Sequence, residues 1–226
     1  MSINLFTFAS SLIYNKTLHG GGEMAKKNIV FDMGGVLVDF DAKRSLTTPF
    51  DPKYHDIINE KTFASETWKL MDKGDYEVEE AIDIMCRDLP RELHDEIRTM
   101  ILDHEGEMPP IKEMYPIVKS LKENGYNIYL LSNCPGWFED FKKSVPAFDF
   151  FDGFIISAKY NLIKPEKEIY EVLFREFSLV PEECFFIDDS PANIETAKNL
   201  GMHGHCFNDK DTNKLIASFK NSGISI

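Results

Sequence analysis

The stretch that decides the fold is IVFDMGG, residues 29–35. Three apolar residues lead without polar alternation into Asp32, and two glycines follow. An unbroken apolar run of this length is typical of a strand buried on both faces of a parallel sheet. In α/β sheets, ligands bind beyond the carboxyl ends of the strands. The stretch therefore predicts a central parallel strand that carries Asp32 at its ligand-binding end.

Four more apolar runs are spaced along the chain, at residues 127–131, 154–156, 184–187 and 205–207. Helical periodicity fills intervals between them, with apolar faces at residues 111–123 and 166–177. A further helix is expected from Ser190, as its N-cap, to Gly201. Strands that alternate with helices predict a doubly wound parallel sheet with right-handed crossovers, which is a Rossmann-like α/β fold.

The pattern changes between residues 41 and 110. Apolar stripes recur there at helical spacing, at residues 78–85 and 93–101, and Gly74 separates two helices. Because this insert directly follows the first strand, we expect an all-helical cap over the edge that carries Asp32; the alternative is a helical extension packed elsewhere. The expected organisation is an N-terminal extension at 1–25, a Rossmann-like core at 26–40 and 111–226, and the helical cap at 41–110.

The N-terminal extension is expected to lie outside the folded core. Residues 1–14 are moderately apolar but have no basic segment and no convincing cleavage site of a secretory signal. A Gly-Gly-Gly-Glu run precedes Met24, and the purine-rich codons of these residues are typical of a ribosome-binding site. We hypothesise that Met24 is the natural start and that residues 1–23 are translated upstream sequence.

The composition is that of a soluble globular protein, with 43% hydrophobic and 28% charged residues. No run of ~18 apolar residues occurs, so no membrane-spanning segment is expected. The formal net charge is −13 and no basic stripe is present, which argues against nucleic acid and anionic membranes as partners. The four cysteines lack metal-ligand spacing, so reduced thiols in a cytoplasmic protein are expected. No sequence feature defines an oligomeric state.

Polar side chains stand where several of the expected strands end. They are Asp32 after the first strand, Ser132 after the second, Lys164 in the loop after the third, and Asp188 and Asp189 after the fourth. One such residue is ordinary, since turns and helix caps often use them. The combination at one edge of a sheet predicts an active site.

The residue types indicate phosphoryl transfer through a covalent intermediate. The Asp32 carboxylate is able to attack phosphorus and form an aspartyl-phosphate. Together with Asp188 or Asp189 it is able to hold Mg²⁺, a hard cation that prefers oxygen ligands. The Ser132 hydroxyl and the Lys164 ammonium are then expected to bind other phosphoryl oxygens.

Two further roles follow from the same arrangement. Backbone N–H groups of the turn at Met33 and Gly34 are expected to assist in binding the phosphoryl group. Lys164 is also able to pair with Asp32 and hold it ionised.

With these residues in order, the sequence resembles the haloacid dehalogenase (HAD) superfamily of hydrolases, in the branch with a helical cap. The resemblance rests on FDMGGVL at residues 31–37, LSN at 131–133, KP at 164–165, and FIDDSP at 186–191 with Asn193. It implies that Asp189 is a direct magnesium ligand, that Asp188 acts mainly through water, and that the backbone carbonyl of Gly34 is the third protein ligand. It also implies a phosphate-binding position at Asn133, within the second motif.

The stretch GGVLVD, residues 34–39, is similar to bacterial sugar-phosphate phosphatases, including alpha-D-glucose-1-phosphate phosphatases. The expected function is therefore a Mg²⁺-dependent phosphomonoester hydrolase for a small phosphorylated metabolite such as a sugar phosphate. Three alternatives remain: a metal-independent haloacid dehalogenase, a phosphomutase, or a catalytically weak binding or regulatory protein. The Asp188 and Asp189 pair argues against the dehalogenase, which has no use for a cation site.

One position departs from the pattern that the resemblance implies. Most phosphatases of the superfamily carry a second aspartate two residues after the nucleophile, as general acid and base, and this chain has Gly34 there. Asp39 and Asp41 are the nearest carboxylates in sequence that are able to replace it. We favour the interpretation that both are ordinary hinge residues at the entrance of the cap.

Other residues with chemical potential have simpler interpretations. His203 and His205 are close enough for a metal pair, but a place in the last strand is favoured. Trp68 and Tyr76 are able to face a sugar, but packing within the cap is favoured.

Overall fold

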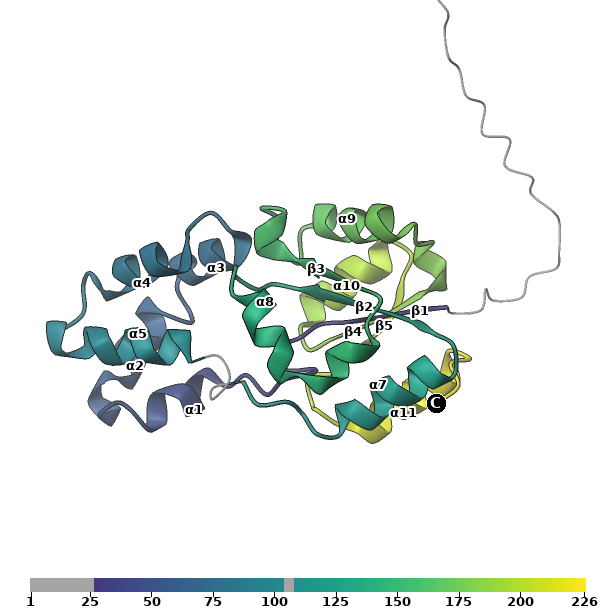
Figure 1. Cartoon of the computed structure of the whole chain (residues 1–226), viewed down its shortest axis with the longest axis horizontal. Helices are drawn as coiled ribbons and strands as arrows, with labels where there is room; N and C mark the ends of the chain where they lie inside the picture. The colour runs from purple at the N-terminus through teal and green to yellow at the C-terminus, as the bar shows by residue number, and fades with distance from the viewer. Residues whose placement is uncertain (1–26, 104–107) are drawn as a thin grey trace, which may run out of the picture.

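A five-stranded, all-parallel sheet forms the centre of the protein in the computed structural model, which describes residues 27–103 and 108–226 (Figure 1). The strands are β1 (Asn28–Phe31), β2 (Asn127–Ser132), β3 (Gly153–Ile156), β4 (Cys184–Asp188) and β5 (His203–Cys206). Their order across the sheet is β3-β2-β1-β4-β5, so β1 lies at the centre. The predicted doubly wound α/β fold is confirmed. The expected N-terminal extension and the Met24 hypothesis lie outside the described residues.

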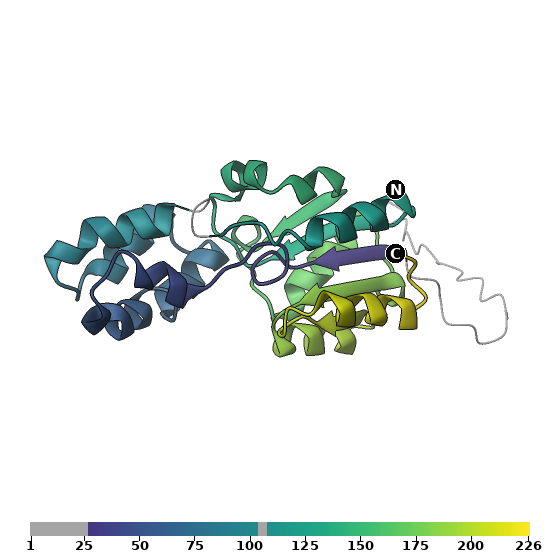
Figure 2. The ribbon, with the colours of Figure 1, turned by 90° about the horizontal axis from the view of Figure 1, so that it is seen from below.

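Helices cover both faces of the sheet (Figure 2). Helices α7 (Met114–Glu123) and α11 (Thr212–Asn221) pack on one face, and α9 (Lys167–Phe177) and α10 (Pro191–Asn199) pack on the other. Successive residues of β1 serve the two faces in turn, because Phe31 belongs to the first hydrophobic cluster and Val30 to the second. This double coverage explains why the strands are apolar without alternation.

Some element boundaries differ from those expected from the sequence. Helix α7 begins at Met114 rather than at residue 111, because the Ile111 N–H donates to the Leu37 carbonyl (2.9 Å) and keeps this segment extended. Strand β5 begins at His203, two residues before the expected apolar run, so both histidines lie within the strand as favoured. Shorter helical pieces complete the chain: α8 (Phe138–Phe141) and the 3₁₀ turns η1 (Pro52–Tyr54), η2 (Arg91–Leu93), η3 (Lys142–Ser144), η4 (Pro146–Phe150), η5 (Ser157–Lys159) and η6 (Pro181–Glu183).

A separate group of helices lies beyond the carboxyl ends of the strands (Figures 1 and 2). This helical unit consists of α1 (Ala42–Thr47), α2 (His55–Lys61), α3 (Glu66–Lys73), α4 (Val78–Cys86) and α5 (His94–Leu102). It has its own hydrophobic cluster, which includes Ile58, Met71 and Ile97. Within the described residues, every helix is too short or too polar to cross a bilayer.

The C-terminal end of α3 is pressed against the core. Gly74 follows the helix with φ 85°, and a Cβ at this position would lie 2.5 Å from the Ala158 carbonyl oxygen of η5. The Ser157 hydroxyl donates to the carbonyl oxygen of Asp72, and the Asn161 amide donates to the carbonyl oxygen of Gly74 (3.1 Å). These contacts fix the last turn of α3 relative to the loop after β3.

Substitution of Gly74 tests this docking. Gly74→Ala and Gly125→Ala both place a side chain on left-handed backbone with φ 85°, which costs roughly 1 kcal/mol at each site. Only the Gly74 variant meets a backbone oxygen, since nothing lies within 4 Å of a Cβ at Gly125. We expect Gly74→Ala to lose about 1–3 kcal/mol more than Gly125→Ala in urea unfolding. Equal losses would show that α3 does not press on the core as described.

Candidate active site

Asp32 follows β1 directly and is buried at the start of a tight turn. Its N–H still pairs with the Ile187 carbonyl of β4 (2.8 Å), and its Oδ1 accepts the N–H of Met33 (2.7 Å). The Met33 carbonyl in turn accepts the N–H groups of Leu37 (2.8 Å) and Val38 (3.0 Å). The backbone therefore holds the Asp32 carboxylate in one place.

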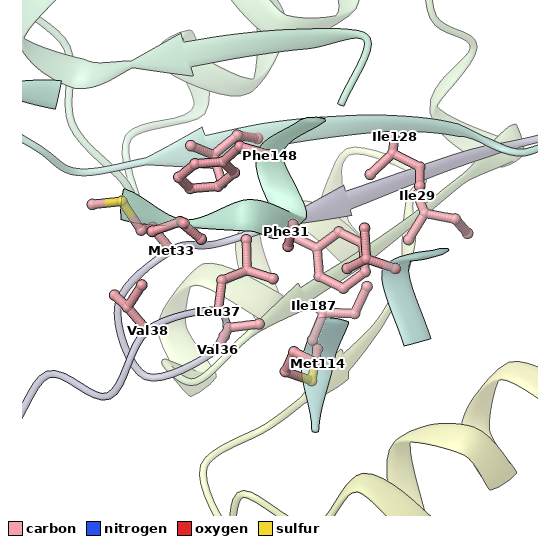
Figure 3. Packing of buried hydrophobic residues seen from close by; sticks show 14 of the residues in the cluster. Ile29, Phe31, Met33, Val36, Leu37, Val38, Met114, Ile128, Phe148 and Ile187 are labelled. Carbon is pink, nitrogen blue, oxygen red and sulfur yellow. The ribbon is translucent and has the colours of Figure 1, made fainter. Parts of the chain in front are cut away.

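Apolar packing anchors the same turn. Figure 3 shows Val36 and Leu37 gathered beside Phe31 and Met114, and all four belong to the buried cluster on the α7 face of the sheet. The turn after Asp32 is thus part of the core rather than a mobile loop.

Position 35 requires glycine for two reasons, its backbone conformation and the nearness of Asp189. Its φ is 70°, and a Cβ there would lie 2.3 Å from Oδ2 of Asp189. A side chain at this position would displace the Asp189 carboxylate. By contrast, nothing lies within 4 Å of a Cβ at Gly34.

The Lys164 ammonium joins two of the carboxylates. Its Nζ lies 2.7 Å from Oδ1 of Asp32 and 2.7 Å from Oδ2 of Asp188, and the Lys164 side chain is 1% exposed. Burial alone would lower the pKa of Lys164, but the charges of Asp188 and Asp32 raise it, so the ammonium stays protonated.

The Asn133 side chain positions Lys164 by hydrogen bonds to the Lys164 backbone. The Asn133 amide donates to the Lys164 carbonyl (3.0 Å), and its Oδ1 accepts the Lys164 N–H (2.8 Å). The side chain of Asn133, which the sequence places among the phosphate-binding residues, is therefore engaged with the loop after β3. Ser132 is buried beside it, and its hydroxyl is 3.5 Å from the Asn133 carbonyl, the outer limit of a hydrogen bond.

Asp188 is held by donors on every side. Its Oδ1 accepts the Ser190 N–H (2.8 Å) and the Asn193 amide (2.9 Å), while its Oδ2 accepts Lys164 (2.7 Å). Ser190 is the N-cap of α10 as expected, but its side chain makes no capping hydrogen bond. The Ser190 N–H instead donates to the Asp188 carboxylate and helps to orient it.

Asp32, Asp188 and Asp189 converge as a cluster of carboxylates. One oxygen from each lies within 4.8 Å of the others. Burial raises the pKa of Asp32 to about 7, against the lowering effect of Lys164, and burial also raises the pKa of Asp189. Three hard oxygen donors with one ammonium among them suit a divalent cation such as Mg²⁺.

A carboxylate from the helical unit faces the same edge. Asp72 on α3 lines a cleft of about 430 Å³ together with Asn133 and Lys164 from the core. Burial raises the pKa of Asp72 to about 7, the charge of Asp32 adds to the increase, and a hydrogen bond from the Trp68 side chain opposes it. Sequence reasoning missed Asp72; the available signal was its i, i+4 spacing from Trp68 on one helix face.

Asp39 and Asp41 are engaged with partners outside the carboxylate cluster. Asp39 lies 2.5 Å from Arg44 and 2.5 Å from Lys210, and hydrogen bonds from both cations, that of Lys210 being the stronger, lower its pKa. Asp41 caps α1 by accepting the N–H of Lys43 (2.9 Å). These partners agree with the interpretation of both as hinge residues.

The aromatic residues of the helical unit mainly pack. Trp68 lies 4.8 Å from Phe63 and stacks on Phe40 at 6.3 Å between ring centroids. Tyr76 packs against the hydrophobic cluster of the unit. Trp68 in addition lines the cleft that contains Asp72.

A family model of haloacid dehalogenase-like hydrolases matches residues 26–201, and the chain belongs to this family. A sesquiterpene phosphatase of Aspergillus oryzae is 29% identical over 185 residues, which cover 79% of this chain and 88% of that protein. A D-ribitol-5-phosphate phosphatase of Bacteroides thetaiotaomicron is 28% identical over 191 residues, covering 78% and 89%. The resemblance found in the sequence is confirmed, and the protein is a hydrolase.

Solved structures share the fold. A HAD-like hydrolase from Porphyromonas gingivalis superposes with a TM-score of 0.64 at 25% identity, covering 85% of this chain and 98% of that one. A HAD enzyme of Bacteroides thetaiotaomicron, solved with magnesium and inorganic phosphate, gives 0.65 at 23% identity, covering 80% and 93%. The L-2-haloacid dehalogenase of Xanthobacter autotrophicus gives 0.59 at 16% identity, covering 79% and 76%. Phosphatases and dehalogenases share this fold, so the choice between them depends on the site.

The raised pKa values of the buried carboxyl groups determine how the unfolding free energy of the metal-free protein should depend on pH. The pKa of Asp32 is about 7 in the folded protein, against an ordinary value of 3.8. Between these values the native state keeps a proton that the unfolded state has lost, so stability falls as pH rises, by up to about 1.4 kcal/mol per pH unit for such a group. We expect Asp32→Asn to flatten the decline in unfolding free energy between pH 5 and 8, measured in urea with chelator.

The exposed residue Asp56 provides the control, and Asp56→Asn is expected to leave the slope of the wild type unchanged. Asp72 and Asp189, whose pKa values are also raised by burial, contribute the part of the decline that remains in Asp32→Asn. If wild type and Asp32→Asn lose stability in parallel, Asp32 does not hold the raised pKa described above.

Proposed function

We propose that this hydrolase is a Mg²⁺-dependent phosphomonoesterase for a small phosphorylated metabolite, with Asp32 as the nucleophile. The observation that carries the proposal is the buried Lys164 ammonium between Asp32 and Asp188, beside the third carboxylate of Asp189. A hard cation and a phosphoryl group together satisfy this mixture of charges. The phosphatase names of the Aspergillus and Bacteroides relatives support the same class of substrate.

The proposed metal ligands are Asp32, Asp189 and the backbone carbonyl of Gly34, with Asp188 acting through water. The hydrogen bonds to both oxygens of Asp188 support its indirect role, because they leave it less free to bind metal directly. The close approach of Asp189 to Gly35 supports a fixed position for the direct ligand. When bound, the cation offsets the repulsion between Asp32 and the phosphoryl oxygens.

The proposed phosphoryl-binding groups are the Ser132 hydroxyl, the Lys164 ammonium and the backbone N–H groups of Met33 and Gly34. Asn133 contributes by holding the Lys164 backbone (2.8 and 3.0 Å). In the reaction, an Asp32 oxygen attacks phosphorus while the bond from phosphorus to the leaving oxygen breaks. Lys164 favours the ionised form of Asp32 that makes this attack, since its charge lowers the Asp32 pKa against the larger effect of burial, and a bound cation would lower that pKa further.

Residues 41–110 are proposed to act as a cap that excludes water and selects the leaving group. The cleft near Lys164 supports this, because its lining combines Phe63, Trp68 and Ile163 with charged side chains of the helical unit. Sugar phosphates are the first substrates to screen. The D-ribitol-5-phosphate phosphatase among the relatives motivates that choice.

The dehalogenase is the main competitor, since a solved L-2-haloacid dehalogenase shares the fold. In that reaction Asp32 attacks carbon and the cluster with Asp188 and Asp189 has no cation to hold. The intact carboxylate cluster favours phosphoryl transfer.

A substrate screen with the nucleophile variant tests the proposal. Wild-type protein is expected to hydrolyse phosphorylated metabolites only with Mg²⁺, and Asp32→Asn is expected to lose orders of magnitude in kcat because an amide does not attack phosphorus. The exposed Asp56→Asn serves as the matched control and is expected to keep wild-type turnover. Release of halide from haloacids in the presence of chelator, without phosphatase activity, would contradict the proposal.

A further inference from the structure

A phosphatase of this kind needs a proton donor that the turn after β1 does not supply. An alkoxide is a poor leaving group unless its oxygen is protonated as the P–O bond breaks. The water that later attacks phosphorus must lose a proton. Gly34 offers no side chain, although nothing lies within 4 Å of a Cβ there. Asp39 is paired with Arg44 and Lys210, and Asp41 caps α1.

Asp72 reaches the site from the opposite side. It occupies the last turn of α3, and its carbonyl oxygen is fixed to the core by the Ser157 hydroxyl. The same hydroxyl accepts the N–H of Cys134 (2.8 Å), which lies two residues beyond Ser132 at the end of β2. One hydroxyl thus connects the backbone of Asp72 to the strand end that carries the phosphate-binding serine.

The carboxyl group of Asp72 belongs to the reaction site rather than to the surface. It shares the cleft with Lys164 and Asn133. It interacts electrostatically with both Asp32 and Lys164, and the Lys164 ammonium in turn lies 2.7 Å from Oδ1 of Asp32. The Trp68 side chain favours the ionised form of this carboxyl group and so lowers its pKa against the effect of burial.

We propose that Asp72 of the helical unit is the general acid and base of this enzyme, in the role that Gly34 leaves unfilled. The assignment rests on the phosphatase function proposed above. It makes the cap a source of a catalytic group as well as a lid.

The proposed reaction has two steps. Asp32 attacks phosphorus, the ester P–O bond breaks, and protonated Asp72 gives its proton to the leaving oxygen, which departs as an alcohol. Asp72, now a carboxylate, takes a proton from water as the water oxygen attacks phosphorus. The bond from phosphorus to Asp32 breaks, and inorganic phosphate and both original side chains result.

The surroundings of Asp72 suit both its role as proton donor and its role as proton acceptor. Burial brings the pKa of its carboxyl to about 7, so the acid and the carboxylate are both populated near neutral pH. The charge of Asp32 raises this pKa and the charge of Lys164 lowers it, and Glu66 and Lys69 are further charged residues that line the same cleft.

The test compares esters that differ in leaving group. Asp72→Asn is expected to lower kcat for an alkyl phosphate by ~10²–10⁴-fold, the usual contribution of a general acid, and to lower kcat for an aryl phosphate far less. Asp75→Asn, an exposed carboxylate just beyond the same helix, is expected to change neither rate. A loss shared equally by alkyl and aryl esters, or confined to KM, would overturn the assignment and make Asp72 a substrate-binding residue.

A second variant provides the rescue. Space is available at Gly34, so Gly34→Asp in the Asp72→Asn background is expected to restore a large part of alkyl phosphate turnover. Rescue also shows that the Asp72→Asn protein folds. No rescue in a double variant whose circular dichroism and Mg²⁺ affinity match the wild type would overturn the proposal. A wild type that hydrolyses neither ester with Mg²⁺ would instead refute the phosphatase function itself, and this assignment with it.

Discussion

The site depends on one buried ammonium. Lys164 lies 2.7 Å from both Asp32 and Asp188, and without it the two carboxylates would lose this shared cationic partner in the interior. Isolated buried charges cost several kcal/mol each, so the paired geometry must be built by the surrounding structure. One positive charge among three carboxylates also leaves negative charge for a bound cation to offset. The charge pattern thus links the stability of the fold to the chemistry proposed for it.

The topology explains how these groups meet. Strand β1 lies between β2 and β4, so Asp32, Ser132 and Asp188 end neighbouring strands at one edge. Local contacts then set their orientation: the Asn133 amide fixes the Lys164 backbone, and the absence of a side chain at Gly35 admits Asp189. A parallel sheet places the residues together, and short hydrogen bonds decide which oxygen faces which partner.

Much of this could be predicted from the sequence because it depends on local pattern. Apolar runs located the strands, and the polar residues at their ends identified Asp32, Lys164 and Asp188 as members of one site. The boundaries of α7 and β5 could not be predicted as well; for α7, pairing between Ile111 and Leu37 overrides helical periodicity. Asp72 was missed for a stronger reason: its place over the site depends on how α3 docks on η5, and the i, i+4 spacing from Trp68 shows only that the two side chains share a helix face.

The proposed reaction requires Asp32 to attack phosphorus and to carry the phosphoryl group. A single turnover of a phosphate ester in water labelled with heavy oxygen, quenched in acid and followed by mass spectrometry of peptides, tests it most directly. If Asp32 is the nucleophile, a transient phosphoryl group forms on the peptide that contains Asp32, and the label appears in the released phosphate and not in the protein. Turnover that leaves no phosphoryl group on that peptide, or that puts the label into the Asp32 carboxylate, would contradict it.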